Sequence, residues 1–212
     1  MKYLEDLNQN QKEAVIHDNG PCLVIAGAGS GKTRVLTYRI AHLISSGVDP
    51  FSILALTFTN KAAKEMKQRI EKIVGTEARS LWMGTFHSIF ARILRSEGYK
   101  LGYPPNFVIY DTQDSKSLIK SIVKELNLDP KIYKENFIYN RISNAKNRLI
   151  SYTDYVNNPI LQEEDASSLR PKICDIYKIY VQRCFKSQAM DFDDLLFNCL
   201  LYTSDAADDM AS

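Results

Sequence analysis

Long hydrophobic runs are missing from this sequence of 212 residues. No apolar stretch approaches the roughly 18 residues that a helix needs to span a bilayer. The opening residues MKYLEDLNQNQ also lack the basic-then-apolar pattern of a secretory leader. We therefore expect a cytoplasmic protein that has no membrane partner.

Cysteine and histidine are also scarce, which limits the metal and redox chemistry that the chain can support. The four cysteines form no Cys-x-x-Cys pair, and the three histidines do not lie at ligand spacing beside them. We therefore expect neither a zinc site nor a disulfide framework. A strong excess of one charge is likewise absent, because 27 basic against 25 acidic residues leave a net charge of +2. This balance neither requires nor excludes a polyanionic partner.

The residues that are present have the composition of an ordinary globular protein. Hydrophobic residues make up 45% of the chain and charged residues 25%, which argues against intrinsic disorder and against a coiled-coil rod. A chain of 212 residues exceeds the length of a typical single domain. One large domain, or one domain and a fraction of another, is expected.

Glycine is concentrated in one part of the chain. Of the nine glycines, four lie between Gly20 and Gly31, and three of these directly follow the apolar run Cys22–Ala26. Downstream, apolar residues recur at helical spacing up to Gly47, which is placed to end the helix. The predicted order is a strand over Cys22–Ala26, a glycine-rich loop and a helix.

Strand and helix patterns then alternate twice more. A buried-type strand at Ile53–Phe58 leads into a helix at about 60–74, and a strand at Leu81–Phe86 leads into a helix at 88–95. Strands that alternate with helices over short loops predict an α/β domain, built on a parallel sheet with helices on both faces.

The pattern changes after about residue 105. One short apolar run, Phe107–Tyr110, is followed by helical spacing almost throughout. We expect an all-α insertion over residues 106–187. The last ten residues, 203–212, hold three aspartates and few apolar side chains, which predicts a disordered or foreign tail.

The glycine-rich loop matches a phosphate-binding motif and predicts a P-loop NTPase fold. The segment Ala26–Thr33 fits Gly-x-x-x-x-Gly-Lys-[Ser/Thr] at every fixed position except the first, where Ala26 replaces glycine. Backbone N–H groups of such a loop, and the N-terminal end of the helix that follows, bind phosphate oxygens. Lys32 is expected to neutralise the β- and γ-phosphates of ATP, and the Thr33 hydroxyl to bind Mg²⁺. A glycine-rich strand-to-helix connection without a ligand is the alternative.

Further segments resemble the motifs of one family. Leu7–Gln11 reads LNQNQ, Thr57–Met66 reads TFTNKAAKEM, and Gly84–Ser88 reads GTFHS. Together with the loop, these segments resemble the Q motif, motif Ia and motif Ib of the superfamily 1 DNA helicases of the UvrD, Rep and PcrA type. Asp191–Leu195 resembles the acidic stretch with which that family returns to its ATPase domain after a helical insertion. The resemblance extends over residues from about 4 to 201.

The resemblance implies a RecA-like ATP-binding subdomain and assigns two residues outside the loop to the nucleotide. The Gln11 amide can pair with the N6/N7 edge of adenine, which would favour ATP over GTP. The Arg34 guanidinium is suited to stacking on the adenine ring. A surface glutamine and a salt-bridging arginine are the alternatives. The residues expected to contact ATP are Gln11, Ala26, Gly27, Ala28, Gly29, Ser30, Gly31, Lys32, Thr33 and Arg34.

The resemblance also implies that single-stranded DNA, and single-strand/duplex junctions, bind where the second and third strands end. Phe58 is expected to stack on a base, because such stacking is worth roughly 1–3 kcal/mol per base and ignores sequence. Phe86 holds a similar position but is expected in the core. For the polar members of the set, N-capping of a helix is the alternative role. The residues expected to contact DNA are Phe58, Thr59, Asn60, Thr85 and His87.

Two charged groups lie in or after the insertion. Arg141, Lys146 and Arg148 have no acid among them, so they form a candidate DNA-contact patch, with a solvated helix surface as the alternative. The aspartates of the segment Asp191–Asp194 suggest a metal site at first sight. Their position before an apolar helical pattern favours a capping or structural role instead.

One motif that ATP hydrolysis needs in this family is missing. The family carries an Asp-Glu pair whose aspartate supports Mg²⁺ and whose glutamate positions the attacking water, and no such pair occurs downstream of Asp191. With the family resemblance, this absence implies that the chain is the N-terminal part of a longer protein, which the resemblance makes an ATP-dependent 3′-to-5′ DNA helicase. The chain lacks the second motor domain and is expected to be inactive by itself.

The expected organisation has four parts. Residues 1–105 form the first part of the ATP-binding subdomain, 106–187 the helical insertion, 188–202 an incomplete return to the first subdomain, and 203–212 the tail. The alternative function is a stand-alone nucleotide-binding or kinase-like P-loop module that does not move along DNA.

Overall fold

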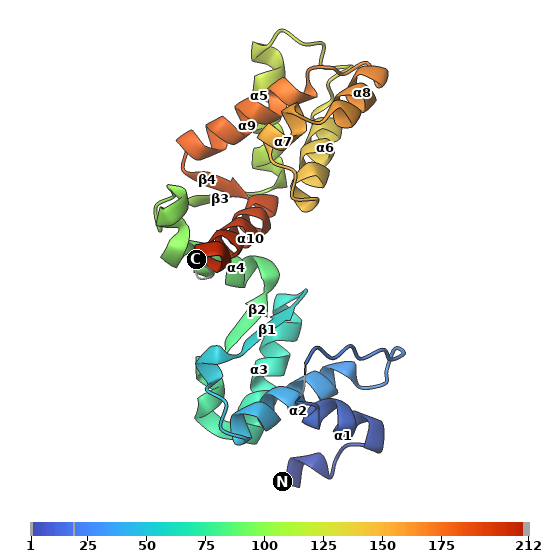
Figure 1. Ribbon diagram of the computed structural model, residues 1–212, viewed down its shortest axis with the longest axis vertical. Helices are drawn as coiled ribbons and strands as arrows, with labels where there is room; N and C mark the ends of the chain where they lie inside the picture. Colours follow the sequence, from blue (N-terminus) through green and yellow to red (C-terminus); the bar gives the residue numbers. More distant parts are fainter. Residues whose placement is uncertain (1, 19, 210–212) are drawn as a thin grey trace. The chain divides into compact units, whose positions relative to one another are not determined.

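The structure is a computed structural model that describes residues 2–18 and 20–209 (Figure 1). The chain divides into two compact units, one within residues 1–89 and one within residues 90–212. None of the described helices combines the length and the apolar character that a bilayer crossing requires.

The first unit contains short helices and one small sheet. Strands β1 (Leu54–Thr57) and β2 (Trp82–Thr85) run parallel, with Thr57 opposite Thr85. Figure 1 shows α3 lying along these two strands. The helices of the unit are η1 (Lys2–Leu4), α1 (Gln9–Ile16), α2 (Lys32–Ser45), η2 (Pro50–Ser52), α3 (Asn60–Val74), η3 (Gly75–Ser80) and the start of α4 (Phe86–Glu97).

The core of the first unit forms because apolar stripes of two helices meet the strands. Ile40 from α2 and Met66 and Ile70 from α3 are buried with Ala55 of β1 and with Leu81, which precedes β2. Helix α3 spans the predicted residues, begins at the Thr59 cap and ends at a glycine of positive φ. The predicted parallel pairing of the second and third strands is confirmed.

The strand predicted over Cys22–Ala26 is wrong for this structure. The segment has no regular secondary structure, and Leu23 and Ile25 are 84% and 89% exposed. A central parallel strand needs paired neighbours and cover on both faces. Among the described residues of this unit only β1 and β2 pair, and the segment Cys22–Ala26 does not pair with either strand. The apolar run therefore lies in solvent, and the expected single sheet with helices on both faces is not formed.

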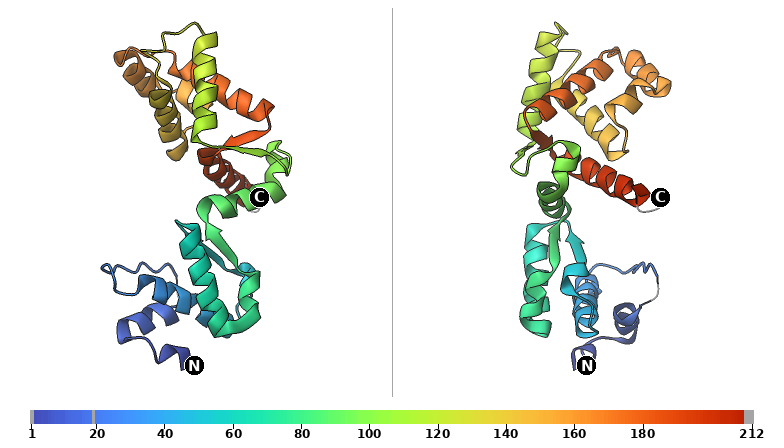
Figure 2. Two further views of the ribbon diagram at one scale, coloured as in Figure 1. Left: turned by 180° about the vertical axis from the view of Figure 1, so that it is seen from behind. Right: turned by 60° about the vertical axis from the view of Figure 1, so that its left-hand side comes forward.

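The second unit is mainly helical. A short parallel pair, β3 (Val108–Tyr110) and β4 (Ala189–Asp191), brings the two ends of the helical region together. Helices α5 and α9, which lie between these two strands in the sequence, cross each other (Figure 2). The helices are η4 (Gly98–Leu101), α5 (Thr112–Glu125), α6 (Glu135–Asn147), α7 (Tyr152–Val156), α8 (Pro159–Ser167), α9 (Ile173–Lys186) and α10 (Phe192–Asp209).

Two apolar clusters hold this unit together. The larger joins the five helices from α5 to α9, with Ile122, Ile142 and Tyr177 buried in it. The smaller packs Leu94 of α4 against Met190 of β4 and against Leu195 and Cys199 of α10. We call residues 188–202, which contain the last three of these, the return segment. The return segment therefore packs on residues 90–109, and the boundary between the two compact units falls within α4.

Helix α10 continues into the segment that the sequence analysis expects to be a disordered or foreign tail. The helix extends to Asp209, so residues 203–209 have helical backbone. Residues 210–212 lie outside the described part of the chain.

Candidate nucleotide and nucleic-acid site

The glycine-rich loop connects the irregular segment 22–26 to α2 and needs glycine at two positions. Gly29 and Gly31 have φ values of 77° and 88°, in the left-handed region that side chains disfavour. Gly31 is the N-cap of α2, and a Cβ there would lie 2.9 Å from the Gln11 amide nitrogen. The loop therefore leads directly into a helix N-terminus, the arrangement in which backbone N–H groups bind anions.

Lys32 folds back over the start of the loop. Its ammonium donates hydrogen bonds to the carbonyl oxygens of Ala26 and Gly27, both at 2.8 Å. Ser30 also bonds to Gly27, through its backbone N–H at 3.3 Å and its hydroxyl at 2.7 Å. These contacts hold the two ends of the loop together. The Lys32 ammonium has three N–H donors and uses two of them here.

Gln11 contacts the loop from α1. Its side-chain nitrogen donates to the Ser30 carbonyl at 3.1 Å, and its side-chain oxygen accepts from the backbone N–H of Asn8 at 3.2 Å. The second contact is half of a capping box, because the Asn8 side chain in turn accepts from the Gln11 N–H. The amide predicted to read adenine therefore joins the start of α1 to the loop.

Arg34 lies in the first turn of α2 and is exposed. Its guanidinium stands over the ring of Tyr38, one turn later, with 5.5 Å between the guanidinium carbon and the ring centroid. Tyr38 also bonds to Asp6 through its hydroxyl at 3.4 Å. Sequence reasoning missed Tyr38, although its spacing of four residues from Arg34 places both side chains on one helix face.

The loop fits a magnesium-bound triphosphate. The N-terminal end of α2, two glycines of positive φ and one lysine are suited to the phosphates. Thr33 is exposed in the first turn of α2 and offers one hydroxyl, and Mg²⁺ commonly takes one or two protein oxygens with waters and phosphate oxygens. Among the described residues no group of three or more histidine, cysteine or acidic side chains could hold a metal by itself.

Two phenylalanines mark the ends of the paired strands. Phe58 follows β1 and is 90% exposed, and Phe86 follows β2 and is half-buried. Their ring centroids are 5.7 Å apart, with 42° between the ring planes. The strand register explains this contact, because each ring comes one residue after the Thr57–Thr85 pair. Phe86 thus supports the flank of a ring that faces solvent.

The polar residues at these strand ends cap the following helices. The Thr59 hydroxyl accepts from the Ala62 N–H at 3.1 Å at the start of α3. The Thr85 hydroxyl accepts from the Ser88 N–H at 3.3 Å and donates to the Ser88 hydroxyl at 3.0 Å. Both threonines therefore have the N-capping role that the sequence left open as the alternative. The N-terminal ends of α3 and α4 lie beside them. Asn60 and His87 are exposed next to these caps.

The basic patch predicted on the insertion is wrong for two of its three residues. Arg141 donates to the Tyr155 hydroxyl at 2.8 Å and to Asp165 at 3.0 Å, and Lys146 is buried. Arg148 alone is exposed. The absence of acids nearby in sequence is misleading, because the partner acids come from α8 and from the return segment.

Lys146 is the centre of a buried ion cluster. Its ammonium lies 2.7 Å from a carboxylate oxygen of Asp191 and 2.7 Å from one of Asp194. The Tyr180 hydroxyl donates to Asp191 at 2.7 Å. Asp191 and Asp194 also cap the start of α10, each accepting the other's backbone N–H. The predicted structural role of these aspartates is confirmed.

One ammonium cannot neutralise two buried carboxylates. Burial raises the pKa of Asp191, but the Lys146 charge and its hydrogen bond outweigh burial and lower it below its ordinary value. Burial and the neighbouring Asp191 charge raise the pKa of Asp194 to about 6. Burial lowers the pKa of Lys146, whereas the two carboxylates raise it by more. Asp194 is therefore the member of the cluster that gains a proton first.

The comparisons with known proteins agree with the resemblance drawn from the motifs. The family model of the UvrD/REP helicase N-terminal domain matches residues 7–211. This match covers nearly the whole chain, so the chain belongs to the UvrD/REP helicase N-terminal domain family.

Individual relatives carry the name ATP-dependent DNA helicase PcrA. The protein of that name from Staphylococcus epidermidis is 44% identical over 198 residues, and the one from Staphylococcus aureus is 43% identical over 198 residues. Each comparison covers 93% of this chain and 26% of the relative. The chain thus spans about a quarter of the length of these relatives.

Proposed function

We propose that this chain is the part of an ATP-dependent DNA helicase that binds Mg-ATP and single-stranded DNA. Family membership supports the helicase reading, and the loop geometry supports the nucleotide. Lys32 would hold the β- and γ-phosphates, Thr33 the magnesium ion, and Gln11 and Arg34 the adenine. The 3′-to-5′ polarity of the whole protein is proposed on the family resemblance alone.

The observation that carries the DNA part of the proposal is the position of Phe58. The Phe58 side chain is 90% exposed, so its apolar ring lies in water. It follows the carboxyl end of the parallel strand β1, the edge at which such sheets bind ligands. Phe86 contacts this ring and still leaves most of its surface open to a base. Helix α3 beside it carries five basic residues against two acids, which favours a phosphate backbone nearby.

We further propose that the segment Cys22–Ala26 becomes a strand of a RecA-like sheet in the longer protein. The apolar side chains of this segment, Leu23 and Ile25 above all, face solvent here. Burial of such a run between flanking strands would remove that apolar area from water. The loop that follows would then stand at the carboxyl edge of the sheet, on the same edge as Phe58.

A pair of variants tests the DNA proposal. Phe58→Ala should weaken binding of labelled single-stranded oligonucleotide by about 5- to 100-fold, the equivalent of roughly 1–3 kcal/mol for one stacked base. ATP binding should stay unchanged in the same variant, because Phe58 is not among the residues that we propose to contact ATP. Fluorescence anisotropy measures the first quantity and isothermal titration calorimetry the second.

Phe51→Ala is the matched control, since Phe51 is also an exposed phenylalanine of the first unit, at 65%. It should bind the oligonucleotide as the parent chain does. Equal affinity of Phe58→Ala and the parent chain would contradict the DNA proposal and favour the nucleotide-binding or kinase-like module without DNA translocation.

A further inference from the structure

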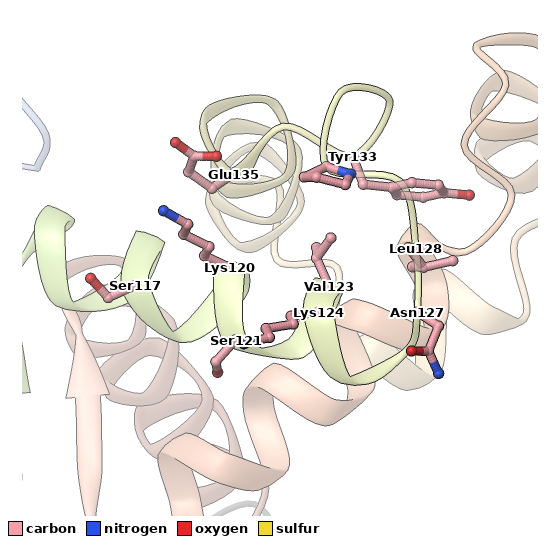
Figure 3. Close-up of a pocket in the computed structure, with 10 residues that line it drawn as sticks. Ser117, Lys120, Ser121, Val123, Lys124, Asn127, Leu128, Tyr133 and Glu135 are labelled. Carbon is pink, nitrogen blue, oxygen red and sulfur yellow. The ribbon is translucent and has the colours of Figure 1, made fainter.

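A groove of about 620 Å³ lies beside the C-terminal half of α5, in the second unit (Figure 3). One wall is α5, and the other is the connection from α5 to α6. We call it the α5 groove. Its volume is within the roughly 300–1,000 Å³ that is typical of binding pockets, and neither the nucleotide loop nor the exposed phenylalanine contributes to it.

The floor of the α5 groove is apolar and fixed in place. Val123, Leu128 and Tyr133 form it, and Val123 points from α5 toward Tyr133 (Figure 3). A Schellman motif ends α5: Asn127 adopts a φ of 53°, and the Leu128 N–H donates to the Val123 carbonyl at 3.1 Å. This bond turns the chain so that Leu128 returns beside Val123.

The opposite wall is held by a bond within the α5–α6 connection and by the segment between α8 and α9. The Tyr133 N–H donates to the Asp129 carbonyl at 2.9 Å, and the Tyr133 hydroxyl accepts from the Lys172 N–H at 3.3 Å. Arg170 donates to the Ile132 carbonyl at 2.7 Å. The groove is therefore preformed, and a ligand would not have to order it.

The rim of the groove is basic. Lys120 and Lys124 are exposed on α5, one turn apart, and Glu135 is the acid that lines the opposite side. Among the described residues, neither Lys120 nor Lys124 forms an ion pair, whereas Arg183 pairs with Glu125 nearby. Two cations without a paired acid thus stand over an apolar floor.

We propose that the α5 groove docks an acidic amphipathic segment of a partner protein. Apolar side chains of that segment would lie on Val123, Leu128 and Tyr133, and carboxylates one helical turn apart would face Lys120 and Lys124. Residues four apart on a helix lie about 5–6 Å from each other, so the two lysines match the spacing of acids on a single helical turn.

The apolar side chains of the groove floor favour a peptide rather than a nucleic acid as the ligand. A phosphate backbone gains nothing from aliphatic side chains, and base stacking needs an exposed ring face. Tyr133 lines the groove with only 7% of its surface exposed, which suffices for contact with an apolar side chain but leaves no open ring face for a base, and its hydroxyl is already bonded. Apolar side chains of a peptide would be buried against the floor. The two lysines would favour a peptide that carries acidic residues beside those side chains.

The test uses the full 212-residue chain and a designed probe. The probe is a fluorescein-labelled helical peptide with leucines on one face and glutamates beside them, and a second peptide carries lysine in place of each glutamate. The acidic peptide should bind, and the charge reversal Lys120→Glu with Lys124→Glu should weaken it at least about tenfold. Ser117→Trp, at an exposed groove position, should block it without any change of charge.

The control Lys178→Glu with Lys186→Glu makes the same charge change on α9, away from the groove lining, and should leave the affinity within about twofold. Equal binding of the acidic and basic peptides, or no binding of either at about 1 mM, overturns the proposal. Displacement of the peptide by duplex DNA, with the same dependence on Lys120 and Lys124, also overturns it, because the surface would then bind phosphates. Circular dichroism melting of each variant verifies that it is folded.

Discussion

At the scale of single residues, Lys32 makes two hydrogen bonds within the glycine-rich loop. Lys32 is exposed, and its two bonds go to carbonyl oxygens that water can also reach. Exposed hydrogen bonds of this kind exchange with water bonds at little net gain. Its proposed contribution therefore lies in ligand binding rather than in stability.

Mg-ATP should raise the melting temperature of the parent chain, and replacement of Lys32 by alanine should abolish this rise. The melting temperature without nucleotide should change by little, because the side chain buries no apolar area. A thermal shift assay with and without Mg-ATP measures both, and Lys72→Ala, an exposed lysine of α3, serves as the control. An equal rise in Lys32→Ala and the parent would contradict the loop assignment.

A second residue-scale prediction concerns the pKa of Asp194, which is about 6 in the folded chain against an ordinary value of 3.8. Between about pH 4 and pH 6 the folded chain holds a proton that the unfolded chain has lost, so this group's contribution to the free energy of unfolding falls as the pH rises. Asparagine at this position cannot titrate. The stability advantage of the parent over Asp194→Asn should therefore shrink from pH 4 to pH 6.

Urea unfolding at several pH values measures this difference. Asp193→Asn, a neighbouring carboxyl that lies outside the Lys146 cluster and accepts from Asn147 at 3.2 Å, is the control. An advantage that grows over the same pH range would show that Asp194 is ionised throughout, with Lys146 fully compensating both carboxylates.

At the scale of elements, the ion cluster is what ties α6 to the return segment. Lys146 comes from α6, and the two carboxylates come from the end of β4 and the start of α10. The β3–β4 pair adds only three residues of parallel ladder. The attachment of the helical insertion therefore depends on a buried charge whose partners are 45 or more residues away in sequence.

Lys146→Met should lower the free energy of unfolding by about 3–5 kcal/mol, because it leaves two buried carboxylates without their cation. Arg148→Met removes an exposed cation two residues later and should stay within about 0.5 kcal/mol of the parent. Urea unfolding followed by circular dichroism compares the two. A similar small effect in both variants would mean that the cluster contributes no more than a surface charge.

At the scale of the whole molecule, the chain carries the loop that we propose to bind nucleotide, and it spans 26% of the length of its helicase relatives. Catalysis needs a group that orients the attacking water, in addition to positions for the phosphates. The sequence of 212 residues contains no Asp-Glu pair to supply it. We therefore propose that this chain binds nucleotide more readily than it hydrolyses it.

The purified 212-residue chain should accordingly show negligible ATP hydrolysis, with or without single-stranded DNA. Release of inorganic phosphate measures turnover, and Lys32→Ala provides the background for contaminating ATPases. DNA-stimulated turnover well above that background would mean that the water-orienting group is present among these residues.

Local patterns in the sequence predicted much of the secondary structure. The helix at 60–74, the parallel strands before Phe58 and Phe86, and the capping role of Asp191 follow from periodicity, glycine stops and side-chain chemistry within a few residues. Two expectations failed for a shared reason. The strand at 22–26 and the basic patch at 141–148 depend on partners that are distant in sequence, and periodicity carries no information about those.

The sequence by itself determined the family, the glycine-rich loop and the helices, because these depend on motif spacing and local backbone preferences. Only the tertiary structure decided that Lys146 is buried between two aspartates, that Phe58 faces solvent beside Phe86, and that an apolar groove with a basic rim lies on α5. Burial, ion pairing and cavities depend on which distant residues become neighbours, and packing sets that.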